Sequence, residues 1–306
     1  MHWGVHLPHL GKAADRDNLL QFAQRVDGLG FHSGWASDHI AWPREILSSY
    51  PYTSDGSFPA PPGTAWLDPI STLTFVAGCT ENLKLGTTVL ILGYRPPVQT
   101  AKMFASLDVL SGGRALLGVG VGWMKEEFDV LQMPFDNRGR RGDEMLDLFE
   151  ALFAEGDPSF DGRWYRIPEI GFEPKPVNGR IPVWVGGNSE PAWRRAVRYG
   201  DAFHAAFEPL DDTVAAWARI GELCDDAARS RDELTLSTRL YLDPGGVMGK
   251  PEVSIQGSSE QMVDQANEWA GIGVEHLVLD PVVPGGPSAR MEALERFMAE
   301  VAPRVT

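Results

Sequence analysis

Residues 182–206 of the chain read PVWVGGNSEPAWRRAVRYGDAFHAA. This stretch predicts an apolar strand over 182–185, a helix over 191–199 and a second apolar strand over 201–206. Two buried strands joined by one helix run parallel, because the helix carries the chain back to the edge of the sheet where the first strand began. The stretch therefore predicts an α/β fold with a parallel sheet.

The same alternation of strand and helix continues along the chain. Strands are predicted over 3–7, 32–37, 84–92, 115–121, 182–185, 201–206, 234–242 and 276–279. Helices are predicted over 19–29, 69–79, 98–110, 144–153, 191–199, 210–229, 261–271 and 288–301. Eight strand–helix units predict closure into a (β/α)8 TIM barrel, a fold that needs about 250 residues.

Three long stretches lack a clear apolar period and account for the residues beyond a minimal barrel. They cover 41–63, 155–180 and 243–257, and the second contains a small predicted hairpin at 160–167. We expect these stretches to be insertions at the rim of the barrel. Because no linker separates two regimes of composition, residues 1–306 are predicted to form a single domain.

Composition narrows the class of protein. The chain has 27 Lys+Arg against 42 Asp+Glu, a formal net charge of −15 that disfavours nucleic-acid binding. No apolar run approaches the roughly 18 residues of a membrane span, and no basic-then-apolar leader is present. The two cysteines, Cys79 and Cys224, rule out a disulfide framework. We expect a cytoplasmic protein that acts on a small-molecule substrate.

Metal-dependent and nucleophilic hydrolysis do not fit the strand ends, where a barrel places its active site. His204 and Asp280 are candidate metal ligands, but the first strand lacks the His-x-His pair that metal-dependent barrel hydrolases use. His2 and His6 share a face of that strand about 13 Å apart, too far for one ion. Gly-x-Ser-x-Gly is absent and neither cysteine ends a strand, so no catalytic metal or nucleophile is expected.

Two glycine-rich segments follow successive predicted strands, GVGVGW at 118–123 and VGGNS at 185–189. Glycine lets a flat ring or a phosphate approach the backbone, although a crowded barrel rim also uses glycine. The second segment precedes a helix, whose free N–H groups favour phosphate. The spacing is not the Gly-x-Gly-x-x-Gly dinucleotide fingerprint. We interpret the segments as a site for a phosphorylated cofactor, with candidates Gly120, Gly122, Trp123, Gly186, Gly187, Asn188 and Ser189.

Several motifs occur in the order and spacing of the bacterial-luciferase-like superfamily, which the chain resembles over nearly its whole length. They are SDH at 37–39, LGTTVL at 85–90, AKMFASLDVLSGGR at 101–114, GVGVGW at 118–123 with EF at 127–128, RGRRGDE at 138–144, and VWVGGNS at 183–189 with RAVRYGD at 195–201. The resemblance implies a (β/α)8 barrel that binds flavin mononucleotide (FMN) or the deazaflavin coenzyme F420. The pattern is closest to the F420-dependent oxidoreductases.

The resemblance also implies roles for individual residues. Thr88–Val89 matches a non-prolyl cis peptide that supports the concave face of the cofactor ring. Asp38 and His39 match residues that touch the ring, where His39 would bind the ring or shuttle a proton as a catalytic residue. The alternative is a rim histidine paired with Asp38. Residues 186–189 match the segment that binds the cofactor phosphate.

The chain departs from some relatives after the fourth strand. Trp123 stands where some sugar-phosphate dehydrogenases of this group have a catalytic glutamate, so that role is not transferred. Glu127 is expected to cap or anchor the next helix. Asp108 and Arg114 are expected to be structural. Two interpretations fit Tyr94, Arg95, Trp42 and Trp66 equally well: they line a substrate pocket, or they pack within surface loops.

The leading hypothesis is an F420-dependent oxidoreductase that transfers a hydride to or from a small organic substrate. The alternative is an FMN-dependent monooxygenase that receives reduced flavin from a partner reductase, and a third is a non-catalytic cofactor-binding protein. We expect a homodimer without a metal. The acidic tail of F420 conflicts with the net charge of −15 unless a basic rim is present. Candidates for that rim are Lys12, Arg16, Arg44 and Arg95.

Overall fold

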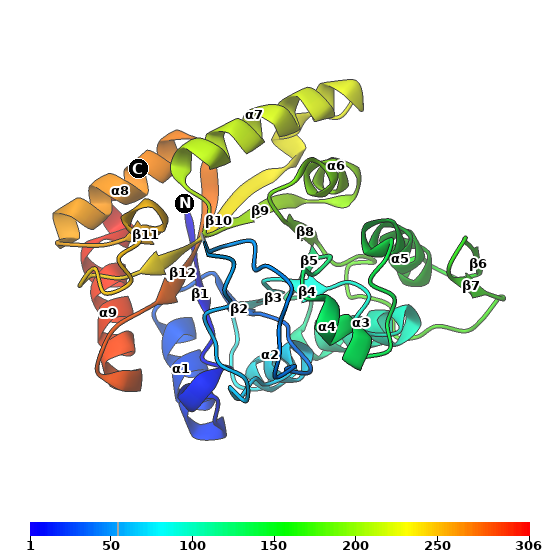
Figure 1. Ribbon diagram of the computed structural model, residues 1–306, viewed down its shortest axis with the longest axis horizontal. Coiled ribbons are helices and arrows are strands. Elements are labelled where there is room, and N and C mark those ends of the chain that lie inside the picture. The colour runs from blue at the N-terminus through cyan, green and yellow to red at the C-terminus, as the bar shows by residue number, and fades with distance from the viewer. Residues whose placement is uncertain (54) are drawn as a thin grey trace.

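The computed structural model describes residues 1–53 and 55–306 and shows a closed barrel of parallel strands surrounded by helices (Figure 1). The barrel strands are β1 (His2–His6), β2 (Ser33–Ala36), β3 (Lys84–Thr87) continued by β4 (Leu90–Ile91), β5 (Ala115–Gly120), β8 (Val183–Gly186), β9 (Ala202–Ala206), β10 (Thr235–Leu242) and β12 (Val274–Pro281). β12 pairs in parallel with β1, His276 opposite His2, which closes the sheet. The predicted (β/α)8 TIM barrel is confirmed.

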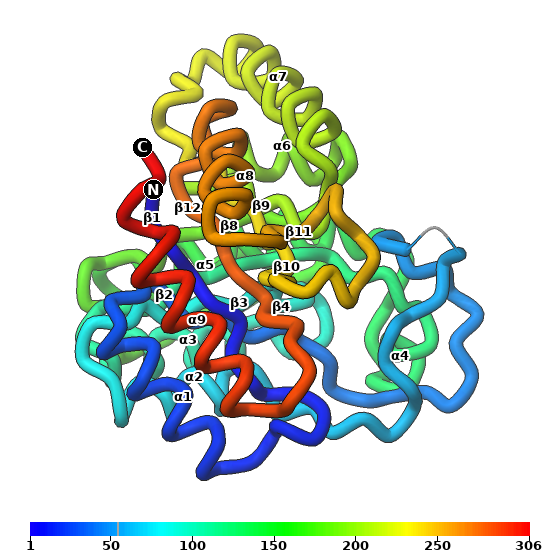
Figure 2. The backbone as a smooth tube through the Cα atoms, turned by 90° about the vertical axis from the view of Figure 1, so that its left-hand side faces the viewer, coloured from blue at the N-terminus to red at the C-terminus, as the bar shows by residue number. Residues whose placement is uncertain are grey.

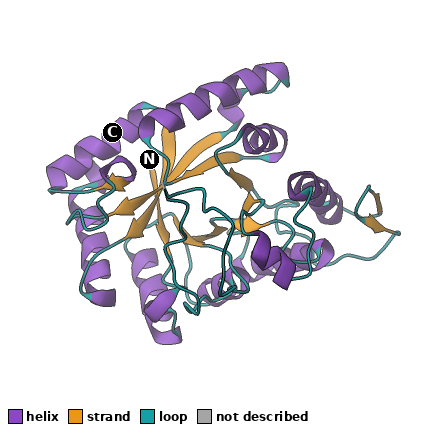
Figure 3. Ribbon diagram, in the orientation of Figure 1, coloured by secondary structure: helices purple, strands orange, loops and turns teal. Residues whose placement is uncertain are grey.

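Eight helices form the outer layer, as the purple ring around the orange strands shows (Figure 3). They are α1 (Arg16–Gly28), α2 (Pro69–Ala77), α3 (Pro97–Ser111), α5 (Arg138–Phe153), α6 (Glu190–Tyr199), α7 (Leu210–Asp226), α8 (Ser259–Gly271) and α9 (Gly286–Glu300). Within the described residues, no helix is both long and apolar enough to cross a membrane. Both chain ends lie close together, away from the 37–68 segment (Figure 2).

Local sequence signals explain several helix starts. Asp68 accepts a hydrogen bond from the backbone N–H of Ser71 at the start of α2, as an N-cap residue does. Ser258 and Gln261 form a reciprocal capping box at the start of α8. The short helix α4 (Lys125–Val130) was not predicted, because six residues are too few to show an apolar period.

The interior of the barrel is filled by aromatic and polar side chains that satisfy one another. The Trp35 ring stacks on the His204 ring with centroids 5.1 Å apart, and Trp35 Nε1 donates to Ser33 Oγ. Ser237 Oγ lies 2.9 Å from His204 Nδ1. Burial lowers the pKa of His204 to about 3, so its ring is neutral. No group of metal-ligating side chains is found among the described residues, and His204 is a core residue.

The predicted strand 84–92 is wrong as one continuous element. It divides into β3 and β4 around a bulge at Thr88 and Val89, which the apolar run alone does not reveal. The predicted helix 144–153 begins earlier, at Arg138, because its charged first two turns carry few apolar residues. The predicted hairpin at 160–167 is confirmed as β6 (Phe160–Asp161) and β7 (Arg166–Ile167). The last insertion contains β11 (Ser254–Ile255), which pairs with β10.

Gly118 of β5 sits against the backbone of the bulge. A Cβ at this position would lie 1.7 Å from the carbonyl oxygen of Thr87. We predict that Gly118→Ala lowers the free energy of unfolding by about 2–3 kcal/mol, because one of the two strands must shift. Gly28→Ala is the matched control, since nothing lies within 4 Å of a Cβ there. Urea denaturation measures both variants, and equal midpoints would contradict this packing.

Candidate active site

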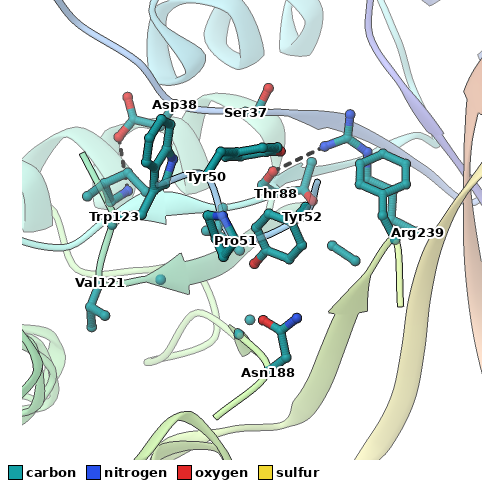
Figure 4. A pocket seen from close by; sticks show the side chains of 18 of the residues that line it. Ser37, Asp38, Tyr50, Pro51, Tyr52, Thr88, Val121, Trp123, Asn188 and Arg239 are labelled. Atoms are coloured by element: carbon teal, nitrogen blue, oxygen red, sulfur yellow. Dashed lines mark hydrogen bonds between the residues drawn. The ribbon is translucent and has the colours of Figure 1, made fainter. Parts of the chain in front are cut away.

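A cavity of about 720 Å³ opens at the carboxyl ends of the barrel strands (Figure 4). Its walls come from β2, the bulge after β3, β5 and β8, completed by β9, β10, β12 and the 37–68 segment. Every residue predicted for the site lines it. These residues are Asp38, His39, Thr88, Val89, Gly120, Gly122, Trp123, Gly186, Gly187, Asn188 and Ser189. The structure also adds residues without a role in the predicted site: Tyr50, Tyr52, Phe58, Arg138, Arg195, Arg239 and Asp280.

The bulge between β3 and β4 forms part of the cavity wall. The Thr88–Val89 peptide is cis, as predicted. Thr88 Oγ1 lies 3.0 Å from His204 Nε2, and Arg239 Nη1 donates to the Thr88 carbonyl at 3.4 Å (Figure 4). The bulge is therefore fixed by side chains from β9 and β10.

Two of the predicted glycines have a different role from the expected one. A Cβ on Gly120 would lie 2.5 Å from a methyl of Val89, and one on Gly186 would lie 2.8 Å from the other methyl. The missing side chains of Gly120 and Gly186 therefore make room for Val89, so the crowded-rim interpretation holds for them. Gly122 and Gly187 differ, since their φ angles of +75° and +120° favour glycine.

Asp38 is paired with an arginine and not with His39. Arg95 donates to both carboxylate oxygens of Asp38 at 2.7 and 2.8 Å and to Asp68 at 2.6 Å. The backbone N–H of Ile91 also donates to Asp38. The interpretation of a His39–Asp38 pair is wrong. Arg95 is likewise no part of a basic rim, because its guanidinium already binds two carboxylates.

The partner of His39 is Glu127, a fully buried carboxylate in the first turn of α4. His39 Nδ1 lies 2.6 Å from Glu127 Oε2, which also accepts the hydroxyl proton of Tyr94 at 2.8 Å. The other oxygen accepts the backbone N–H groups of Ile40 at 2.6 Å and Ala41 at 3.0 Å. Because a carboxylate accepts from Nδ1, that nitrogen carries a proton, and Nε2 is the nitrogen left to exchange a proton with a ligand.

This cluster gives the outcome of two expectations. Glu127 anchors its own helix α4 to the end of β2 and does not cap it, so the anchoring alternative holds. Tyr94 does not line the cavity, since it is buried and points its hydroxyl at Glu127. The sequence signal was the acidic pair Glu126–Glu127 after the glycine segment, but its link to a residue 88 positions earlier depends on the fold.

Burial by itself would raise the pKa of the Glu127 carboxyl. The hydrogen bond and charge of His39, with the two backbone N–H groups, outweigh burial and hold this pKa below its ordinary value of 4.5. Glu126, its neighbour, accepts the backbone N–H groups of Leu47 and Ser48 at 3.0 Å each. The two adjacent carboxylates therefore anchor successive parts of the 37–68 segment at the cavity.

The opposite side of the cavity suits a phosphate. Ser189 is the N-cap of the ten-residue helix α6 but makes no side-chain capping bond, so the first-turn N–H groups lack that partner. Arg195 is buried and binds Asp143 at 2.6 Å. Arg138 donates its Nε to the Gly122 carbonyl at 3.0 Å. Glycine, hydroxyl and guanidinium groups thus converge beside a helix N-terminus, a donor set that fits a phosphoryl group.

One buried donor at the cavity has no partner in the described part of the chain. Arg239 binds Asp280 and the Thr88 carbonyl through its Nη atoms, while its Nε makes no hydrogen bond. Glu208, at the end of β9, is also buried, and burial raises its pKa to about 7. An unpaired donor on a cavity wall is a group that a bound ligand satisfies.

The chain belongs to the luciferase-like monooxygenase family, whose model matches residues 2–245. It is 31% identical over 282 residues to an uncharacterised protein of Mycobacterium tuberculosis, with 91% of each chain covered. It is also 31% identical over 247 residues to the F420-dependent hydroxymycolic acid dehydrogenase of Mycobacterium tuberculosis, with 78% of this chain and 61% of that protein covered.

Solved structures show the same fold. An F420-dependent secondary alcohol dehydrogenase in complex with an F420-acetone adduct superposes with a TM-score of 0.81 at 16% identity, covering 100% and 99% of the two chains. The FMN complex of the oxygenating constituent of the Pseudomonas putida 3,6-diketocamphane monooxygenase superposes with a TM-score of 0.75 at 17% identity, again covering 100% and 99%. At these identities the likeness concerns the barrel alone.

We predict that Glu127→Gln lowers the free energy of unfolding at neutral pH by about 2 kcal/mol, because charge-assisted hydrogen bonds are lost. The folded-state pKa of Glu127 lies below 4.5, so the stabilisation is present above the unfolded value and is lost as the pH falls through the folded one. The difference between wild type and variant should therefore shrink in acid.

Urea denaturation at a series of pH values measures this difference. Glu155→Gln, which alters an exposed carboxylate, is the control and should match the wild type throughout. A difference between wild type and Glu127→Gln that stays constant from neutral to acidic pH would contradict the buried, ionised carboxylate.

Proposed function

We propose that the protein is an F420-dependent oxidoreductase that moves a hydride between the coenzyme and a small organic substrate. The observation that carries the proposal is the buried His39–Glu127 pair, which presents an imidazole to the cavity at the carboxyl ends of the strands. The similarity to F420-dependent dehydrogenases supports the choice of coenzyme.

The residues present fit such a cofactor. Trp123 and the Thr88–Val89 bulge would hold the ring, with the free Nε of Arg239 as a donor. Residues 186–189, the start of α6 and Arg138 would hold the phosphate. When bound, the deazaflavin accepts or donates a hydride at its C5.

His39 supplies the proton chemistry that must accompany hydride transfer. In the direction of oxidation, Nε2 accepts the hydroxyl proton of an alcohol while the carbon-bound hydrogen leaves as hydride, and a carbonyl compound remains. Glu127 fixes the ring through Nδ1 and stabilises the imidazolium that forms. In the reverse direction, the imidazolium returns the proton to the carbonyl oxygen. The surrounding aromatic rings exclude water.

An arginine cluster at the start of α5, beside the proposed phosphate site, favours F420 over FMN. Arg138, Arg140 and Arg141 begin α5, whose first turn has no acidic residue. Arg138 and Arg141 also line a second cavity of about 80 Å³ next to the first. Three cations at a helix N-terminus oppose the helix dipole, an arrangement that an anion relieves. The cluster would supply the basic rim that the acidic tail of F420 requires, whereas Lys12, Arg16 and Arg44 do not line the cavity.

The FMN-dependent monooxygenase remains the second candidate. It has a structural neighbour with FMN bound, but that likeness is one of fold. It requires a reductase to supply reduced flavin, and the assay below separates the two, because only F420 chemistry proceeds without oxygen and without a reductase. A homodimer remains part of the proposal.

We predict that His39→Ala lowers kcat for F420-coupled alcohol oxidation under anaerobic conditions by about 10²–10⁴-fold, since the proton acceptor is lost. The affinity for F420 should change far less. The matched control is His2→Ala, which changes an exposed histidine at the start of β1 and should retain full activity. Unchanged turnover in His39→Ala would favour the non-catalytic interpretation.

We predict that the double variant Arg140→Ala/Arg141→Ala raises the Kd for F420 by about five- to tenfold, because two positive charges near the acidic tail are lost. The Kd for the deazaflavin chromophore without phosphate and glutamates should stay unchanged, and added salt should weaken only F420 binding. Arg44→Ala is the control. An effect of Arg44→Ala that equals that of the double variant would place the tail elsewhere.

A further inference from the structure

The imidazole of His39 is enclosed by aromatic side chains. Trp42 and Trp66 each lie 4.9 Å from it between ring centroids, Phe58 lies at 5.4 Å and Trp123 at 6.4 Å, with interplanar angles of 72–81°. All four rings turn an edge or a face toward His39. Any substrate group that reaches Nε2 must therefore contact aromatic carbon.

No free charge lines this part of the cavity in the described residues. Both carboxylates on the cavity wall are paired, Asp38 with Arg95 and Asp280 with Arg239. Arg138 lies in another part of the cavity, at the start of α5, where Arg195 donates to the Gly139 carbonyl. An anionic group placed at His39 would lose its hydration without gaining a cation, which costs several kcal/mol.

Phe58 lies in the middle of the 37–68 segment, and its phenyl ring forms part of the aromatic wall around His39. Its ring stacks on Trp123 with centroids 5.4 Å apart and 16° between planes, and meets the edge of Trp42 at 4.9 Å. Tyr50 packs on its other side at 4.8 Å. Phe58 thus fills the space between Trp123 and Trp42 next to His39, and its side chain limits how large a group can reach Nε2.

We infer that the substrate is a neutral alcohol or carbonyl compound with an apolar, preferably flat, body, and that Phe58 determines the size accepted. This inference rests on the proposed function, because it assigns His39 to the reacting oxygen. A sugar phosphate is disfavoured by the same observations, since the aromatic wall around His39 offers, among the described residues, no unpaired cation for its phosphate.

The test measures ligand binding to the F420-loaded protein by calorimetry. Benzyl alcohol and benzoate share a ring and differ in charge, so the wild type should bind benzyl alcohol at least about tenfold more tightly. Naphthylmethanol presents a larger body. In Phe58→Ala the ratio of its affinity to that of benzyl alcohol should rise by about tenfold or more.

Phe75→Ala is the matched control, because Phe75 is exposed on the outer face of α2. Phe58→Leu keeps an apolar filler and should give an intermediate ratio, which protects the test against misfolding of the alanine variant. Equal or tighter binding of benzoate, binding of neither ligand, or an unchanged size ratio overturns the inference. Failure to load F420 at all overturns the proposed function instead.

Discussion

The cavity depends on one buried carboxylate. Glu127 accepts four hydrogen bonds, from His39, Tyr94 and the backbone of Ile40 and Ala41. Burying an ionised group is costly unless its lone pairs are satisfied, and here each oxygen accepts two donors. Because the donors come from the ends of β2 and β4, the carboxylate fixes both the histidine and the start of the segment that covers the cavity.

The second constraint is steric and concerns the bulge at Thr88 and Val89, which packs against β5 and β8. The bulge at Thr88 and Val89 pushes its backbone and the Val89 methyls toward β5 and β8, where only glycine leaves enough room. Gly118, Gly120 and Gly186 are therefore explained by packing, while Gly187 and Ser189 line the cavity at the start of α6. The glycines of these segments therefore do not all have the same role.

Much of the fold follows from the sequence because strand and helix periods are local. The βαβ stretch at 182–206 and the Asp68 cap required no tertiary information. The pairing of side chains did require it. Arg95 binds Asp38 from 57 positions away, and Glu127 binds His39 from 88, so neither partner can be chosen from spacing.

For the candidate site, too, the location could be predicted from the sequence but the side-chain contacts could not. All predicted site residues gather around one cavity because the carboxyl ends of parallel strands meet there. The aromatic enclosure of His39 was not predicted as a unit, since Phe58 and Trp42 lie in a stretch without any period. The net charge of −15 also gave no sign that three arginines lie in the first turn of α5.

Equilibrium titration of the purified protein with F420 and, separately, with FMN tests the central claim most directly. Trp66 and Trp123 line the cavity, so their fluorescence reports occupancy. The account predicts saturable quenching by F420 and binding of FMN weaker by at least about tenfold, the equivalent of 1.4 kcal/mol. Tight binding of FMN without any response to F420 would contradict it.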